Sequence, residues 1–349
     1  MVQFQQMMRS IVDTQTEVML SYLRAKGEPA IAASTPAGMV AADSKDHGLP
    51  LVDDGGVRVA DDGRLEFVRE LDPAVDLYLD DHRLDGRPVF PAAMAMELMA
   101  EIAQCWRRDL EVVEISNFQL LRGIVLEDGP LPIRVVASPR TQASESGRGP
   151  SVDVGIFVNA QDPLPRYRGV VTLADHLPDS RHVVPPPSAE LAPFPLSVSE
   201  SYEKWLFHGR LFEAITVIDG ISSQVLEARL APSRPSRCVA QRPESSWLID
   251  PVVVDGSFQM AILWSRHHND MTPLPSRFDR YTRFGSLNQP GLRCVLSAGC
   301  SANGHTLKTQ HLFIAEDGTV VGLLEGMEST CSKELNRLAG KTVRTGGDS

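Results

Sequence analysis

Short segments in which hydrophobic and polar residues alternate recur along most of this chain. Alternation with a period of two is typical of strands that bury one face, so these segments predict an antiparallel, strand-rich protein. The predicted strands are residues 65–71, 112–126, 133–138, 152–158 and 167–173 in the first half of the chain, and residues 214–219, 225–230, 292–300, 307–314 and 320–328 in the second half.

Two longer segments, residues 91–107 and 251–266, are apolar on nearly all sides and predict buried helices. Each begins with a proline, which is tolerated in the first turn of a helix. Each half of the chain therefore pairs one apolar helix with a run of strands, and a helix enclosed by a sheet must be hydrophobic almost all round. The pattern predicts an α+β fold of the double-hotdog type, with two antiparallel sheets each wrapped around a long apolar helix.

The segments around these two halves are more polar or richer in proline. Apolar residues spaced at about 3.6 predict an amphipathic helix near the N-terminus, which either dimerises the protein or only precedes the first domain. The predicted organisation is an N-terminal helix and flexible linker over 1–48, an N-terminal hotdog over 49–184, a proline-rich linker over 185–195, a C-terminal hotdog over 196–333 and a polar tail over 334–349.

The composition excludes several classes of function. The net charge of -11 and the pI near 5.3 argue against a nucleic-acid-binding or anionic-membrane-binding surface. No apolar run approaches the roughly 18 residues of a membrane span, and the N-terminus lacks the pattern of a secretory signal. The five cysteines are scattered without a C-x-x-C pair, which favours reduced thiols in the cytoplasm over a disulfide framework or a zinc site.

A histidine, a glycine and a proline stand immediately before the first apolar helix, as His82, Gly86 and Pro91. The imidazole has an unperturbed pKa of about 6.5, which suits proton transfer near neutral pH. The start of a helix offers free N–H groups and a partial positive charge. Together these groups predict a site that removes a proton from carbon and stabilises the resulting oxyanion.

The second apolar helix contains a carboxylate one turn from its start. Asp255 lies among apolar residues, and Gln259 lies four positions further on the same face. A lone buried carboxylate is costly to ionise, so its pKa should rise and suit it to act as a general acid. We expect Gln259 to hold the carboxyl by a hydrogen bond. The competing interpretations are that His82 only caps a turn, that Asp255 is favoured near the helix start by the helix dipole, and that Gln259 lies on the helix surface.

These residues resemble the motifs of polyketide synthase dehydratase domains over about residues 49–333. His82, Gly86 and Pro91 match H-x-x-x-G-x-x-x-x-P, and Asp255 and Gln259 match D-x-x-x-Q. Residues 206–212 resemble a third motif, Tyr-Gly-Pro-x-Phe. The sequence around residues 85–101 most resembles dehydratases of polyunsaturated-fatty-acid synthases and of enediyne-type iterative polyketide synthases.

The chain departs from the family pattern at four positions. Ala92 follows the motif proline where the family usually has glycine. His208 and Arg210 replace the tyrosine and proline of the third motif, and Asp250 stands where histidine is common. We expect these changes to alter the shape of the substrate pocket more than the chemistry.

The resemblance implies a dehydratase that converts 3-hydroxyacyl thioesters, carried on an acyl carrier protein, to trans-2-enoyl thioesters. His82 would be the base and Asp255 the acid, with N–H groups near Gly86 and Ala92 stabilising the enolate oxygen and Gln259 orienting the acid. No metal or cofactor is implied beyond the phosphopantetheine of the carrier. The partners implied are the carrier protein, neighbouring synthase domains and a second copy in a homodimer. The residues expected to line the substrate are Pro91, His208, Gly209 and Phe212.

Other interpretations remain open at this point. Glu97 is either an alternative acid or a partly buried structural carboxylate. The resemblance also allows a product-template aldol cyclase, and a non-catalytic hotdog that binds acyl chains or acts as a scaffold is a third possibility.

Two groups of charged or titratable residues outside these motifs have less specific patterns. The adjacent His267 and His268 diverge on a helix, so a metal site with Asp270 is not favoured. Residues 277–283 carry three arginines in a predicted proline-flanked loop, which is either solvated or docks an acidic carrier protein.

Overall fold

The computed structural model describes residues 48–53, 56–127, 129–141, 147, 149–158, 162–183, 190–240, 245–300 and 304–340. All of these belong to one structural unit. The predicted N-terminal helix, nearly all of the linker after it, the first part of the proline-rich linker and the end of the tail lie outside the described residues, so the predictions for them stay predictions.

Twelve of the described strands form one antiparallel sheet, in the order β1-β2-β6-β7-β8-β5-β11-β14-β13-β12-β10-β9. The strands are β1 (Arg58–Val59), β2 (Leu65–Leu71), β5 (Glu111–Leu120), β6 (Leu131–Pro139), β7 (Ser151–Phe157), β8 (Tyr167–Ala174), β9 (Ile215–Ile221), β10 (Val225–Leu230), β11 (Thr272–Arg283), β12 (Leu292–Cys300), β13 (Thr306–Ile314) and β14 (Val320–Ser332). The first six in spatial order come from the first half of the chain and the last six from the second half.

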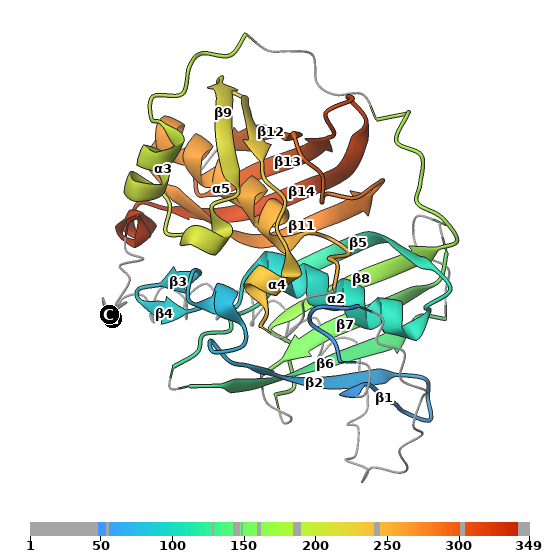
Figure 1. Cartoon of the computed structure of the whole chain (residues 1–349). Helices are drawn as coiled ribbons and strands as arrows, with labels where there is room; N and C mark the ends of the chain where they lie inside the picture. Colours follow the sequence, from blue (N-terminus) through green and yellow to red (C-terminus); the bar gives the residue numbers. More distant parts are fainter. Residues whose placement is uncertain are drawn as a thin grey trace. The chain divides into compact units, whose positions relative to one another are not determined.

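The two halves join where β5 pairs with β11, at the middle of the sheet (Figure 1). Phe118 and Phe278 face each other across this junction with stacked rings, 4.7 Å between centroids. The predicted loop at residues 277–283 is therefore wrong, because it is part of a central strand. The prolines at 273 and 275 lie before the stretch that pairs with β5, where a missing N–H on that side costs no hydrogen bond.

The long helices α2 (Ala92–Trp106) and α5 (Pro251–Asn269) each lie against their own half of the sheet and contact each other (Figure 1). Every residue of α2 from Ala92 to Ala103 is buried, as is every residue of α5 from Pro251 to Ser265. The prediction of two helices that are enclosed on nearly all sides is confirmed, and so is the α+β, double-hotdog fold class.

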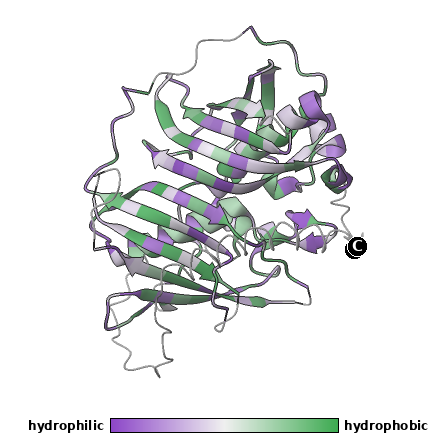
Figure 2. Cartoon of the chain, turned by 180° about the vertical axis from the view of Figure 1, so that it is seen from behind, coloured by the Kyte–Doolittle hydropathy of each residue, from purple (hydrophilic) through white to green (hydrophobic). Residues whose placement is uncertain are grey.

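The opposite face of the sheet shows hydrophilic and hydrophobic residues alternating along several strands (Figure 2). An antiparallel sheet with one face on the helices and one in solvent produces this alternation. The same alternation in the sequence located most strands well, since the bounds of β10 and β12 agree with the prediction. The strand predicted to end at residue 126 ends earlier, at Leu120.

The structure also contains several short elements, of which only the helix near residues 199–206 was predicted from the sequence. One of them lies at the start of the predicted polar tail, where a short helix buries Leu335 and Leu338. No described helix is both long enough and apolar enough to cross a membrane. The short elements are η2 (Leu77–Leu79), β3 (Arg83–Leu84), β4 (Arg87–Pro88), α3 (Val198–Lys204), η3 (Arg210–Phe212), α4 (Pro235–Cys238) and η4 (Glu334–Leu338).

The β5–β11 junction gives a prediction about stability. Replacing Phe278, which is 2% exposed, with alanine should lower the free energy of unfolding by about 3–5 kcal/mol, because it removes a buried aromatic ring and leaves a cavity. Chemical denaturation followed by circular dichroism measures the change. Val217→Ala on the edge strand β9, where the side chain is 42% exposed, is the control and should stay within about 0.5 kcal/mol. Equal effects of the two substitutions would contradict the junction's importance.

Candidate active site

A short hairpin positions His82. Strands β3 and β4 pair through a two-residue turn at Asp85 and Gly86, both with positive φ (50° and 80°). A turn of this kind favours Asp-Gly, and its length fixes which residues face each other. Val89 consequently lies opposite His82, donating its N–H to the His82 carbonyl at 2.9 Å.

The orientation of the His82 ring follows from the same hairpin. Its Nδ1 lies 2.8 Å from the carbonyl oxygen of Val89. A carbonyl oxygen only accepts hydrogen bonds, so Nδ1 carries the proton and Nε2 keeps a free lone pair. His82 is therefore held as the tautomer that can accept a proton at Nε2.

Gly86 has a different role from the one expected. It lies exposed at the tip of the hairpin, and a Cβ there would meet nothing within 4 Å. The position requires glycine for its positive φ, so Gly86 serves the turn and not the oxyanion. The start of α2 remains the candidate oxyanion site. Its N-cap residue, Pro91, has no side-chain hydrogen bond to the first N–H groups of the helix, and Ala92 is buried.

A series of hydrogen bonds holds Asp255 on α5. Gln259 Nε2 donates to Asp255 Oδ2 at 2.8 Å, which is the hydrogen bond that the sequence predicted. It also donates to the carbonyl of Phe212 at 2.8 Å. Tyr202 donates its hydroxyl to Gln259 Oε1 at 2.8 Å. Tyr202 thus orients the Gln259 amide, which in turn holds the Asp255 carboxyl. No local sequence pattern indicated Tyr202, because its partner is 57 residues away.

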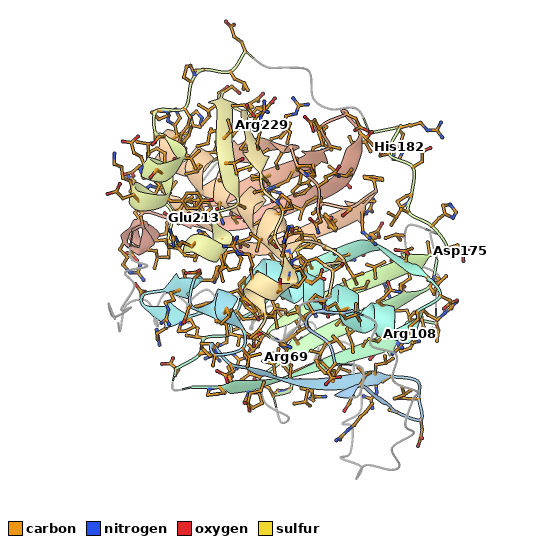
Figure 3. The ribbon with its side chains drawn as sticks, in the orientation of Figure 1. Arg69, Arg108, Asp175, His182, Glu213 and Arg229 are labelled. Atoms are coloured by element: carbon orange, nitrogen blue, oxygen red, sulfur yellow. The ribbon has the colours of Figure 1, made fainter. Side chains whose placement is uncertain are left out.

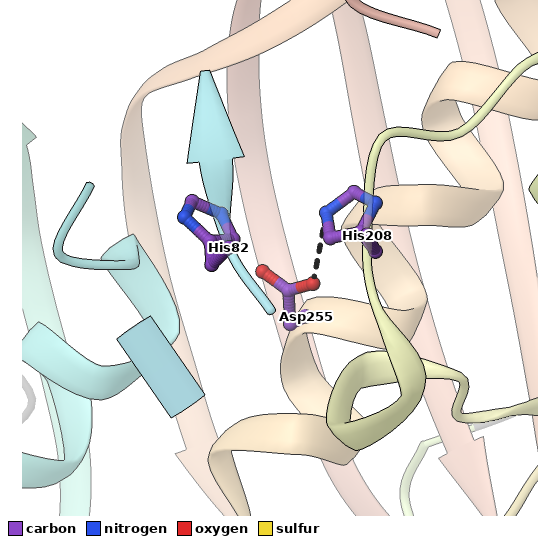
Figure 4. A group of neighbouring side chains, drawn as sticks. All are labelled: His82, His208 and Asp255. Carbon is purple, nitrogen blue, oxygen red and sulfur yellow. Dashed lines mark ion pairs between the residues drawn. The ribbon is translucent and has the colours of Figure 1, made fainter. Parts of the chain in front are cut away.

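His208 completes a compact group with His82 and Asp255 (Figure 4). Its Nε2 lies 3.2 Å from Asp255 Oδ2, and its ring centroid lies 5.5 Å from that of His82. The three side chains come from separate segments and point toward one another. The rings of Phe207 and Phe212 pack around them, with the Phe212 centroid 5.5 Å from that of His82.

Backbone contacts close the two halves of the fold at this point. His82 and His208 form an isolated antiparallel bridge. The carbonyl of Asp81 accepts the N–H of Gly209 at 2.8 Å, and its carboxylate accepts the N–H of Leu211 at 2.9 Å. A Cβ on Gly209 would lie 2.1 Å from Asp81 Oδ1, so only glycine permits this approach. Asp81 was not singled out from the sequence.

A cavity of about 580 Å³ opens next to the group. Asp81, His208, Gly209, Arg210 and Glu213 are among its lining residues, whereas His82 and Asp255 are not. Figure 3 labels Glu213, which follows η3. His208 both lines the cavity and contacts Asp255, so it links the cavity to the buried carboxyl.

Burial shifts the three titratable groups toward their neutral forms. It lowers the pKa of His82 to about 4. Burial, assisted by the nearby His82, lowers the pKa of His208 well below its usual value. Burial also raises the pKa of Asp255 to about 7, although the hydrogen bond from Gln259 opposes that shift. Near neutral pH the site therefore contains neutral imidazoles and a carboxyl that retains much of its proton, which is the arrangement of a base beside an acid.

Glu97 is engaged elsewhere. Its two carboxylate oxygens accept the N–H groups of Leu248 and Ile249 at 2.8 and 2.6 Å. It is fully buried, where partial burial was expected, and burial together with Glu101 raises its pKa. Glu97 holds the backbone that leads into α5, which is a structural role and not that of an alternative acid.

The remaining candidates from the sequence also have structural partners. Asp250 caps α5 by accepting the N–H groups of Val252 and Val253 at 3.1 and 3.2 Å. His268 Nε2 lies 3.0 Å from the carbonyl oxygen of Ser222, away from any metal-binding group among the described residues. The arginines of β11 form ion pairs across the sheet; the pairs are Arg277–Glu328, Arg280–Glu114 and Arg283–Glu111.

Comparison with known proteins agrees with this geometry. Two tandem hotdog halves that share one histidine–aspartate site define a class of double-hotdog acid–base enzymes. A family model described as "Polyketide synthase dehydratase domain" matches residues 50–149, and one described as "Polyketide synthase dehydratase N-terminal domain" matches residues 183–339. The chain belongs to the polyketide synthase dehydratase family.

Individual relatives are similar to this chain in sequence or in fold. Over 266 residues, 72% of its length, the chain is 27% identical to one of the subunits of a polyunsaturated fatty acid synthase from Thraustochytrium sp., of which it spans only 9%. The dehydratase domain from the CurJ module of curacin polyketide synthase superposes with a TM-score of 0.65 at 16% identity, covering 83% of this chain and 98% of that one. The dehydratase domain of PpsC from Mycobacterium tuberculosis, in complex with C12:1-CoA, gives 0.61 at 17% identity, covering 82% and 100%.

The raised pKa of Asp255 predicts a pH dependence of stability. Between its usual value of 3.8 and about 7, the group is protonated in the folded protein and ionised in the unfolded one. Stability should therefore fall as pH rises through this window, by roughly 2–3 kcal/mol from about pH 5 to about pH 8. Asp255→Asn has no titrating group at this position, so its loss of stability between the two pH values should be smaller by that amount. Urea titrations at the two pH values measure the difference. Parallel losses in both proteins would contradict the shift.

Proposed function

We propose that this domain removes water from 3-hydroxyacyl thioesters carried on an acyl carrier protein and releases trans-2-enoyl thioesters. The observation that carries the proposal is the buried meeting of His82 and Asp255, one from each half of the fold, where burial favours the neutral form of both side chains. A base and an acid on opposite sides of a substrate are what a β-elimination requires.

In the proposed mechanism, His82 Nε2 takes the proton α to the thioester carbonyl. The electrons form the double bond between the α and β carbons as the bond to the β-hydroxyl breaks, and Asp255 gives that hydroxyl its proton, so that water leaves. The His82–Val89 hydrogen bond keeps the base in the required tautomer. Transfer of the proton from His82 back to Asp255 resets the site.

The start of α2 is the proposed oxyanion site. An α-proton next to a thioester is weakly acidic, so charge that develops on the carbonyl oxygen needs stabilisation. The first N–H groups of α2 lack a side-chain cap, and Ala92 and Ala93 at its start are buried. The N–H of Ala92 can fill the role usually given to glycine, with its methyl group narrowing the pocket. These side chains and backbone groups suffice without a metal or an organic cofactor.

The proposed substrate form and setting follow from the relatives. The PpsC structure contains an acyl thioester of coenzyme A, and the curated relative belongs to a polyunsaturated fatty acid synthase. We therefore place this domain in an iterative polyketide or polyunsaturated-fatty-acid-like synthase, with the phosphopantetheine of a carrier protein as the arm that delivers the substrate. The scattered cysteines of the sequence fit action in the cytoplasm. The aldol cyclase and the non-catalytic scaffold are not favoured.

The first prediction of this mechanism concerns the acid and the base. His82→Ala and Asp255→Asn should each slow water loss from a 3-hydroxyacyl carrier protein by about 10²–10⁴-fold, since each removes a proton-transfer group. Mass spectrometry of the carrier-bound chain measures the reaction. The exposed pair Asp175 (labelled in Figure 3) and His176 provides matched controls. Asp175→Asn and His176→Ala should retain full rate, and unchanged rates in folded His82→Ala and Asp255→Asn would refute the assignment.

A second prediction concerns the closure of the two halves. Gly209→Ala should push Asp81 away and displace His82 from Asp255, and a misplacement of about 1 Å can cost about 10²-fold in rate. The same mass-spectrometric assay measures the turnover number. Gly123→Ala is the control, because a Cβ at Gly123 meets nothing within 4 Å. A Gly209→Ala protein with wild-type turnover would show that the contact does not position the base.

A further inference from the structure

The cluster of His82, His208 and Asp255 also has the composition of a metal site. Each residue offers one ligand atom, and these atoms lie within 4.8 Å of one another. His208 Nε2 and Asp255 Oδ2 are already 3.2 Å apart. Two ligand atoms on a tetrahedral Zn²⁺ ion, with bonds of about 2.0–2.1 Å, are separated by roughly 3.3 Å. Small rotations of His82 and Asp255 would bring the third ligand atom to that separation.

The contacts behind two of the three side chains, His82 and Asp255, are those of metal ligands. A metal-binding histidine typically donates its second N–H to a carbonyl or carboxylate, which leaves the other nitrogen for the ion. His82 does so through Nδ1 and the Val89 carbonyl at 2.8 Å. Asp255 is held by Gln259 at 2.8 Å, as ligating carboxylates commonly are held by hydrogen bonds.

His208 is the residue that turns a catalytic pair into a three-donor set. It stands where the third motif, Tyr-Gly-Pro-x-Phe, has tyrosine. Its Nδ1 is buried and has no hydrogen-bond partner among the described residues. Two imidazoles and one carboxylate suit Zn²⁺ and similar transition ions, whereas Mg²⁺ and Ca²⁺ prefer oxygen ligands.

The adjoining cavity offers a cation a route to the cluster. Its lining includes His208 and the acidic residues Asp81, Glu203 and Glu213, against the single cation Arg210. A concave surface with an excess of negative charge raises the local concentration of cations.

We propose that His82, His208 and Asp255 bind one Zn²⁺ ion and that this ion reversibly inhibits the domain. The ion would occupy the His82 lone pair that accepts the α-proton and displace the Asp255 proton that the leaving hydroxyl needs. Three protein ligands leave a fourth position for water or for the substrate hydroxyl. Binding stands on the geometry alone, while inhibition rests on the proposed dehydratase function.

The binding experiment titrates metal-free protein with ZnCl₂ in competition with a chromogenic zinc indicator. We expect the wild type to bind one equivalent of zinc. Loss of a hydrogen bond to a metal ligand typically weakens metal binding by about 10–100-fold, and His208→Tyr, which removes a ligand itself, should weaken it by more. Two control proteins, His267→Ala/His268→Ala and Cys300→Ser, remove the exposed groups that attract zinc adventitiously and should bind like the wild type. The absorption spectrum of the Co²⁺-substituted protein should show bands that His208→Tyr loses.

The second arm measures the inhibition of water loss by ZnCl₂ and its reversal by EDTA. The zinc concentration for half-inhibition should rise in His208→Tyr by the same factor as its zinc dissociation constant. Binding that survives His208→Tyr, or that disappears in either control protein, would overturn the site. If the wild type binds zinc at this cluster but never catalyses water loss, the proposed function fails while the metal site stands.

Discussion

Hydrogen bonds between the segment at Asp81 and His82 and the segment from His208 to Leu211 hold the candidate active site together. His82 belongs to the first half of the fold and Asp255 to the second, so neither half contains a complete site. These contacts use main-chain groups and the Asp81 carboxylate, and Gly209 lets the two segments approach closely. The broad β5–β11 junction then holds the halves rigidly behind this small contact.

Burial is the second constraint, and it acts on His82 and Asp255 at once. Removing water disfavours a positive imidazole and a negative carboxylate alike, so the pKa of His82 falls while that of Asp255 rises. His82 and Asp255 can therefore lie close together without forming an ion pair. The hydrogen bond from Gln259, which Tyr202 holds, limits how far the pKa of Asp255 rises.

The sequence located the parts of the site that depend on local spacing. The distance from His82 to Pro91 is set by one hairpin, and the distance from Asp255 to Gln259 by one helical turn, so both could be predicted. Strand β11 was missed because its prolines resemble breakers, and only its neighbours in the sheet make it a strand. Asp81 and Tyr202 were missed for the same reason, since their partners lie 130 and 57 residues away.

The starts of the two long helices differ in one respect. Helix α2 begins with uncapped amides, whereas α5 begins with the Asp250 carboxylate against its own N–H groups. An anionic oxygen is attracted by the first and repelled by the second. The two halves are built alike but differ in this respect, so of these two helices only α2 presents an uncapped start to an anionic oxygen.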